Sequence, residues 1–237
     1  MFDRLDETWQ AIRVEVKPKT ASNKVAVVFA GAAHTHRLAR AAMVLIDADF
    51  VAETSPLTRA VYECALTTHW AAQVDDSALQ LSDQEIRAHR ALVRELQEAR
   101  LLDQIPPERR KLPSDQDQHI TKITFEQICD DLNPGGDEAY AIYRILSAYS
   151  HATTTAIGRY LQPDDRQPLG FTASDVAEPE EPDFQVFLLV ASLVWAGRAV
   201  DYFDSGHSRR SELRSAARAI GINSELVPSD KFHMRTI

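Results

Sequence analysis

The chain has 237 residues, of which 44% are hydrophobic and 26% are charged, an ordinary balance for a globular protein with a substantial core. Its formal charge of −9 excludes a generic polyanion-binding protein, because affinity for nucleic acid comes largely from neutralising phosphates. Any nucleic-acid site must therefore be local. Only 8 glycines accompany many alanines, leucines and arginines, and this composition predicts an all-α fold.

Cysteine usage and the distribution of apolar residues indicate a cytoplasmic protein that needs no cofactor. Cys64 and Cys129 stand in helix-compatible segments without CxxC spacing, so they predict neither a zinc site nor a disulfide framework. The N-terminal segment is acidic and amphipathic, which is unlike a secretory signal. The most apolar segment, 186–197, is too short to span a bilayer, and no membrane contact is expected.

Apolar residues recur at three- and four-residue spacing, which predicts about seven or eight helices within a single helical domain, 1–237. An N-terminal helix and turn should occupy 1–22 and a core bundle 23–161, followed by an acidic loop at 162–182 and by C-terminal helices with a tail at 183–237. Within these regions the spacing predicts helices at about 2–14, 23–52, 56–74, 82–102, 137–161, 183–203 and 208–220, with a short one between Thr124 and Asn133.

Three start signals fix helix boundaries. Ser55 followed by Pro56 predicts an N-cap with proline in the first turn. The segments 82–85 and 124–127 both have the form of a capping box. The proline-rich segment 162–182 is too long for a routine connection, so it is interpreted as either a mobile loop or a functional cover.

The run 143–151 carries the main chemical signal. Arg144 and His151 are seven residues apart, so in a helix they return to nearly the same angle after two turns, with Ser147 between them. Arginine can hold a phosphate, histidine can move a proton and a hydroxyl can orient either one, which suits metal-independent phosphodiester chemistry. Alternatively, Arg144 and His151 cap a carbonyl or pair with a nearby acid.

A second polar pair, Arg59 and Glu63, lies four residues apart among apolar neighbours. Partly buried charges need partners, so these two form either a structural ion pair or part of a site. The last predicted helix carries Arg210, Arg214 and Arg218 at four-residue intervals. These arginines form either a solvated face or a surface that binds an RNA backbone.

Metal ligation receives little support from the histidines. His34 and His36 are two residues apart and point in different directions on a helix, whereas the helical zinc pattern needs a spacing of four. A metal site assembled across helices could still draw on His36, Glu63, His69 or His151.

The segments 55–63 and 143–151 together resemble a group of uncharacterised bacterial helical proteins related to the HEPN superfamily, over roughly residues 25–165. The resemblance implies a HEPN-like helical bundle that forms a homodimer. Active members are metal-independent ribonucleases with an arginine, four to six intervening residues and a histidine, and Arg144 and His151 fit this motif. The resemblance also implies that two protomers bring their motifs together, and that the protein serves in a toxin-antitoxin or phage-defence system with an antitoxin or another defence protein as partner.

We therefore interpret the chain as a metal-independent RNA endonuclease. His151 acts as general base or acid, Arg144 stabilises the phosphorane, and Ser147 orients His151 or binds a phosphate oxygen. Arg59 and Glu63 position the site from the neighbouring helix. The alternative is a non-catalytic helical module that binds a nucleotide, another small anion or a protein partner through the same groove; a metal-dependent hydrolase is the third interpretation.

Overall fold

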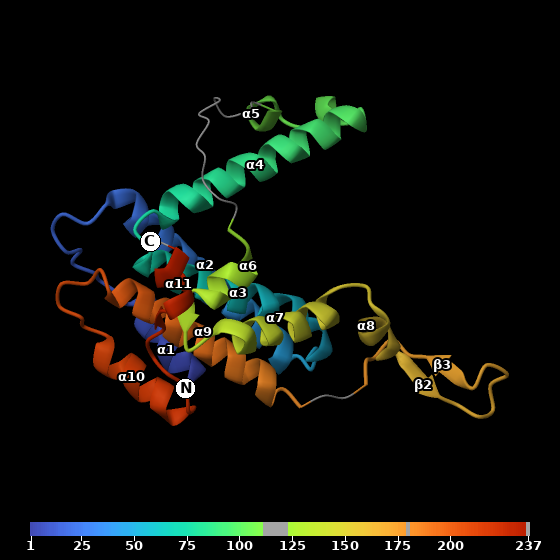
Figure 1. The fold of residues 1–237 in the computed structure, drawn as a ribbon. Coiled ribbons are helices and arrows are strands. Elements are labelled where there is room, and N and C mark those ends of the chain that lie inside the picture. The colour runs from blue at the N-terminus through green and yellow to red at the C-terminus, as the bar shows by residue number, and fades with distance from the viewer. Residues whose placement is uncertain (111–122, 179–180, 236–237) are drawn as a thin grey trace.

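The structure is a computed structural model that describes residues 1–110, 123–178 and 181–235. It is mostly helical, as the composition predicted (Figure 1). The helices are α1 (Phe2–Gln10), α2 (Ser22–Asp47), α3 (Ser55–Gln73), α4 (Ser77–Glu98), α5 (Pro107–Arg110), α6 (Phe125–Asp130), α7 (Gly136–Ser150), α8 (Thr154–Gly158), α9 (Asp183–Asp201), α10 (Arg210–Ala219) and α11 (Asp230–Arg235), with short 3-10 turns at Ala52–Thr54 and Leu102–Gln104. Two small antiparallel pairs join β1 (Leu132–Asn133) to β4 (Val227–Pro228) and β2 (Leu161–Pro163) to β3 (Phe171–Ala173).

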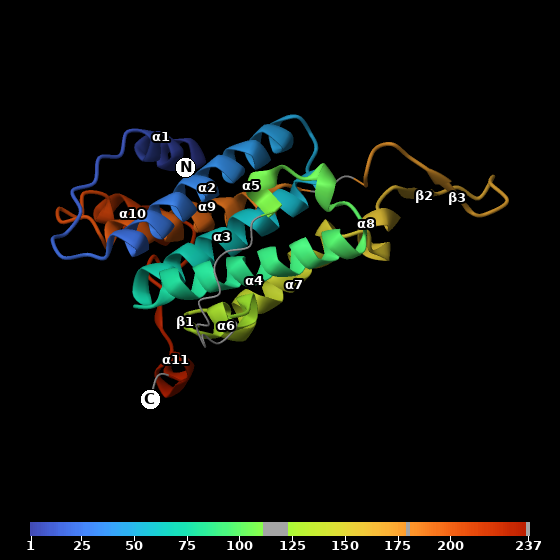
Figure 2. The same ribbon diagram turned by 90° about the horizontal axis from the view of Figure 1, so that it is seen from above.

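Helices α2, α3 and α9 pack together at the centre of the bundle (Figure 2). Most residues of α9 are buried because the helix is apolar on nearly all sides. Among the described residues α9 alone is long and apolar enough to cross a membrane, and 72% of its most apolar stretch is buried within the bundle. It therefore has the surroundings of a central core helix.

Helix α3 is the element on which the candidate site depends, because it also packs against α7. It begins at Ser55 with Pro56 in its first turn, as the start signal predicted. Gly31 allows α2 to approach α3 closely: a Cβ atom at this position would lie 2.2 Å from Thr68 Oγ1. The absence of a side chain at Gly31 thus sets the spacing of the two helices.

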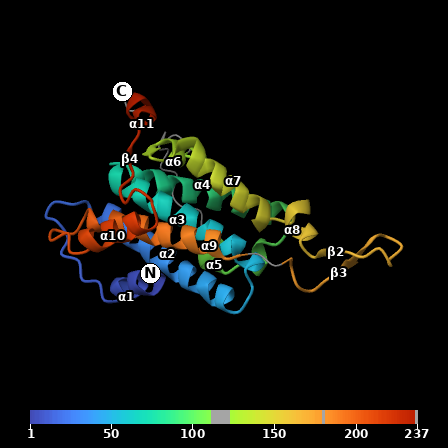
Figure 3. The ribbon, with the colours of Figure 1, turned by 90° about the horizontal axis from the view of Figure 1, so that it is seen from below.

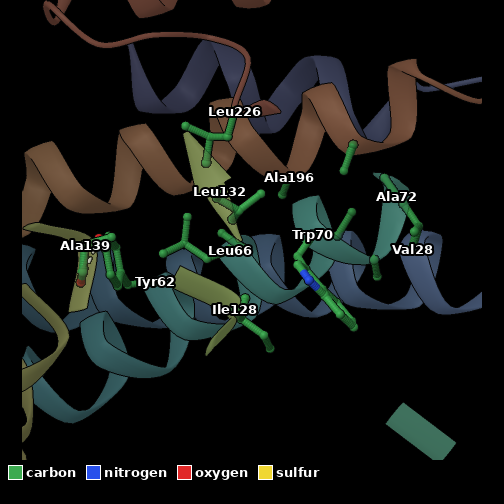
Figure 4. Close-up of a cluster of buried hydrophobic side chains, with 14 of the residues drawn as sticks. Val28, Tyr62, Leu66, Trp70, Ala72, Ile128, Leu132, Ala139, Ala196 and Leu226 are labelled. Carbon is green, nitrogen blue, oxygen red and sulfur yellow. Dashed lines mark hydrogen bonds between the residues drawn. The ribbon is translucent and has the colours of Figure 1, made fainter. Parts of the chain in front are cut away.

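One hydrophobic cluster joins α3 to the elements on either side (Figure 4). Leu66 and Trp70 of α3 pack with Ile128 of α6, Leu132 of β1 and Leu226 near β4. The indole Nε1 of Trp70 donates to the carboxylate of Asp131 at 3.0 Å, so the polar end of this buried ring is also satisfied.

Two elements stand away from the bundle. Helix α4 contacts α2 and α3 but lies apart from α7 and α9 (Figure 1). The β2–β3 hairpin extends outward beyond α8, at the end of the bundle where α7 terminates and α9 begins (Figure 3).

The described residues form eleven helices where seven or eight were predicted, and α1 and α2 end at Gln10 and Asp47, earlier than the predicted residues 14 and 52. Three further boundaries are corrected. Helix α4 begins at Ser77, so the capping box predicted at Ser82 is wrong, whereas the capping box at Thr124 is confirmed by both of its hydrogen bonds. The segment 162–182, predicted as a loop, contains the whole of β3 and the last two residues of β2. Residues 179–180 of this segment lie outside the described ranges.

The third correction concerns α7, which was predicted to continue to residue 161 and ends at Ser150. His151 is extended, with φ −108° and ψ 164°, and Thr153 caps the short helix α8 by accepting from Ala156 N at 3.2 Å. Serine and threonine hydroxyls compete for backbone groups and favour helix ends. The hydroxyl of Thr153 also donates to Ala148 O at 2.5 Å, which closes α7.

Candidate functional site

Arg59 is held at the contact between α3 and α7. Its Nε donates to Ser147 Oγ at 3.0 Å, and its Nη2 donates to the Tyr143 hydroxyl. The guanidinium carbon lies 4.7 Å from the centre of the Tyr143 ring, and Nη2 lies 3.3 Å from a carboxylate oxygen of Glu63. Arg59 therefore joins α3 to α7 through three contacts, while its ion pair with Glu63 stays within α3. Tyr143 is a partner that the sequence analysis missed.

Ser147 contacts Arg59, whereas it was predicted to orient His151. Its hydroxyl accepts from Arg59 and donates to Tyr143 O at 2.8 Å. The predicted role of orienting the histidine has no support from a described contact. Tyr143 could have been found from the sequence, because it precedes Ser147 by one helical turn and lies on the same face.

Arg144 and His151 occupy the exposed side of α7 and the residue that follows it. The described residues provide no side-chain hydrogen bond or ion pair to either one. The prediction that both belong to one helix is wrong, because His151 is the residue at which α7 ends. Both side chains are exposed, and neither lines one of the hollows described below.

Two adjoining hollows share Glu63, the ion-pair partner of Arg59, in their lining. The first, about 380 Å³, lies among α3, α4 and α6, and the second, about 310 Å³, lies among α2, α3 and α4. Glu63, Thr67 and Leu81 line both of them. Glu85 adds a second carboxylate to the first hollow, while the thiol of Cys64 lines the second, where burial raises its pKa.

Residues 25–168 match a family of unknown function, DUF5677. The chain belongs to the DUF5677 family. No curated protein and no solved structure matches the chain. The DUF5677 segment runs from α2 to the turn after β2, so it contains the Arg59 contacts, Arg144 and His151.

The arginines of α10 lie outside the DUF5677 segment. Arg214 Nη2 is 2.6 Å from Glu225, and Arg210 Nε is 3.5 Å from the buried carboxylate of Asp201, whereas Arg218 is exposed. Two of the three cations are thus paired with acids, which leaves little free charge for a phosphate backbone on this helix.

The three histidines considered for a metal site have different neighbours. His36 is buried beside Asp6, and His69 is buried between the carbonyl oxygens of Trp195 and Leu226. His151 is exposed at the end of α7. Within the described ranges no group of three or more His, Cys, Asp or Glu side chains is placed to hold a metal ion.

Proposed function

We propose that this chain is a metal-independent, HEPN-like RNA endonuclease whose reacting pair is Arg144 and His151. The observation that carries the proposal is the contrast between two arginines. The guanidinium of Arg59 donates hydrogen bonds to Tyr143 and Ser147 and forms an ion pair with Glu63. Arg144 lies one helical turn from Ser147, is exposed, and has no hydrogen-bond or ion-pair partner among the described residues, so its fork of donors is available to a phosphate.

The proposed reaction uses only these two side chains and the RNA itself. His151 takes the proton from a ribose 2′-hydroxyl, and the 2′-oxygen attacks the adjacent phosphorus. Arg144 stabilises the charge that develops on the non-bridging oxygens. The bond from phosphorus to the 5′-oxygen breaks, and this oxygen accepts the proton that His151 took from the 2′-hydroxyl, which gives a 2′,3′-cyclic phosphate and a 5′-hydroxyl and leaves His151 neutral again.

Packing against a second protomer would enclose the exposed side chains of Arg144 and His151, as the HEPN resemblance implies. Next to Arg144 along the chain, α7 also exposes Ile145 to 49% and Tyr149 to 38%. Burying these apolar side chains against another copy would exclude water from around Arg144 and His151. Their electrostatic interactions with a bound phosphate would then be stronger. A role in toxin-antitoxin or phage-defence systems follows from the resemblance alone.

An RNA cleavage assay in EDTA tests the proposal. Wild-type protein is expected to cleave, and Arg144→Ala and His151→Ala are each expected to lose activity by at least about 100-fold, the usual contribution of a general acid–base or of a charge-stabilising donor. His34→Ala is the matched control because His34 is exposed on α2 and should retain full activity. Equal cleavage by wild type and His151→Ala, or no cleavage by wild type, would contradict the proposal.

The hollows beside Glu63 favour a second candidate function, a binding module for a small organic cation. Glu85 supplies negative charge beside Glu63, whose carboxylate is shared with Arg59, while Leu81 and Phe125 supply apolar surface. A volume of about 380 Å³ lies in the range of small-molecule pockets. This lining favours an amine with an apolar body over the nucleotide or anion that the sequence interpretation considered.

Thermal unfolding with two matched probes separates this candidate from the first. Phenylbutylamine should raise the unfolding temperature of wild type, and phenylbutyrate, which has the same ring and chain with opposite charge, should not. Glu85→Gln should reduce the response to the amine while leaving the Arg59 contacts intact. Equal responses to both probes would reject the binding function without bearing on RNA cleavage.

A further inference from the structure

The β2–β3 hairpin has one apolar and one polar face, and both are open to solvent. Leu161 pairs with Ala173 and Pro163 with Phe171, so these four side chains share a face, whereas Gln162 and Thr172 form the pair on the other face. All residues of both strands are exposed, including Phe171 at 42% and Leu161 at 45%. A two-stranded hairpin alone is marginally stable in water, and within the described part of the chain the apolar face of this one stays exposed.

The hydrogen-bond pattern defines the free edges of the hairpin. Asp164 N donates to Gly170 O at 3.0 Å and Ser174 N donates to Tyr160 O at 2.9 Å. Because bonded and non-bonded pairs alternate in an antiparallel ladder, the N–H and C=O groups of Phe171 and Ala173 point outward from β3. On β2 the outward position at residue 163 is a proline, which has no N–H to donate.

The outward edge of β3 is complementary to itself. If two copies of β3 run antiparallel about a two-fold axis at Thr172, each Phe171 faces the Ala173 of the other copy. Both residues carry outward N–H and C=O groups, so the two pairs can each exchange two hydrogen bonds. The interface is isologous, with the same patch used by both copies.

We infer that β3 is a docking edge for β3 of a second copy of this chain, which makes a continuous four-stranded sheet in the order β2–β3–β3–β2. Four strands exceed the number at which a small sheet becomes stable by itself. The two-fold axis keeps both apolar faces on the same side, so each Phe171 ring packs against Ala173 of the other copy. This inference is independent of the proposed RNA cleavage.

The register predicts a specific cross-link. The two Thr172 residues would face each other as a non-hydrogen-bonded pair, with Cα atoms about 4.5 Å apart, a separation that a disulfide spans. Under mild oxidation, full-length Thr172→Cys should form a disulfide-linked dimer on a non-reducing gel. Gln162→Cys is the matched control, because Gln162 shares the polar face of the hairpin and lies on the strand that would stay outside the new pairing.

A second variant separates the ladder from chance collision. Thr172→Cys combined with Ala173→Pro lacks an outward N–H that the pairing needs, and its dimer yield should fall at least about 10-fold while its helical circular dichroism stays unchanged. Equal cross-linking of Thr172→Cys and Gln162→Cys, or full cross-linking of the proline double variant, would overturn the inference. Neither result depends on RNA cleavage.

Discussion

His36 makes the stability of this fold depend on pH. The imidazole is fully buried, its Nδ1 lies 3.2 Å from Asp6 Oδ1, and its ring stacks on Trp9 at a centroid distance of 4.5 Å. Burial lowers the pKa of His36 from 6.5 to about 4, with a further lowering by the positive charges of Arg209 and Arg40, although the hydrogen bond with Asp6 acts in the opposite direction.

The sign and the size of the effect follow from this shift. In the unfolded chain the imidazole binds a proton near pH 6.5, whereas the folded protein keeps it neutral down to about pH 4. Stability is therefore complete above pH 6.5 and falls as the pH drops towards 4, by about 1.4 kcal/mol per pH unit. Between pH 7.5 and pH 5.0 the free energy of unfolding should decrease by about 2 kcal/mol because of His36 alone.

Urea unfolding at pH 7.5 and pH 5.0 measures this difference. His36→Gln should lose about 2 kcal/mol less than wild type over the same interval, because glutamine does not titrate. His34→Gln is the control, since His34 is exposed two residues away and should behave as wild type. If wild type and His36→Gln show the same pH dependence, the imidazole does not remain neutral in the fold and the reasoning is refuted. His69, whose pKa is also lowered by burial, accounts for dependence that remains in both proteins.

Three further changes test the packing around the site. Arg59→Met removes the hydrogen bonds to the two α7 hydroxyls and should lower the free energy of unfolding by about 1 to 3 kcal/mol in urea titrations. Gly31→Ala places a methyl group against Thr68 and should destabilise by about 1 to 3 kcal/mol, which the double variant with Thr68→Ala should partly restore. Arg198→Leu removes the hydrogen-bonded partner of buried Asp201, which keeps only the more distant Arg210 and His207, and should cost about 3 kcal/mol, measured in the same way.

Each change has a control elsewhere on the chain. Arg144→Ala removes an exposed arginine from α7 and should leave stability within about 0.5 kcal/mol, so an equal loss for Arg59→Met and Arg144→Ala would contradict the role given to Arg59. Arg214→Ala breaks a half-exposed ion pair and should cost less than about 1 kcal/mol. Additive losses for Gly31→Ala and Thr68→Ala would show that the two positions are not in contact.

The sequence predicted those elements whose boundaries local chemistry determines. Pro56 in a first turn and the capping box at Thr124 both gave correct helix starts, because each signal acts within a few residues. Ser82 carries the same capping pattern but lies inside α4, since the helix had already begun at Ser77. A capping box contributes about 1 kcal/mol, which continued helix packing can exceed.

The site was predicted only in part because its geometry depends on contacts between helices. The apolar neighbours of Arg59 and Glu63 indicated that both would be partly buried with partners, but the partners from α7 are set by the packing of α3 against α7. Placing His151 on the helix relied on angular spacing alone and overlooked the threonine run after it, where Thr153 caps a new helix. The self-complementary edge of β3 was beyond reach, since a loop was expected there.

The chemical ends of the RNA products test the central claim most directly. Mass spectrometry of fragments made by wild-type protein in EDTA should find 2′,3′-cyclic phosphates, or their hydrolysis products, together with 5′-hydroxyls, because the 2′-oxygen is the nucleophile in the proposed reaction with Arg144 and His151. Fragments with 3′-hydroxyl and 5′-phosphate ends would require water as the nucleophile, and that result would contradict the account.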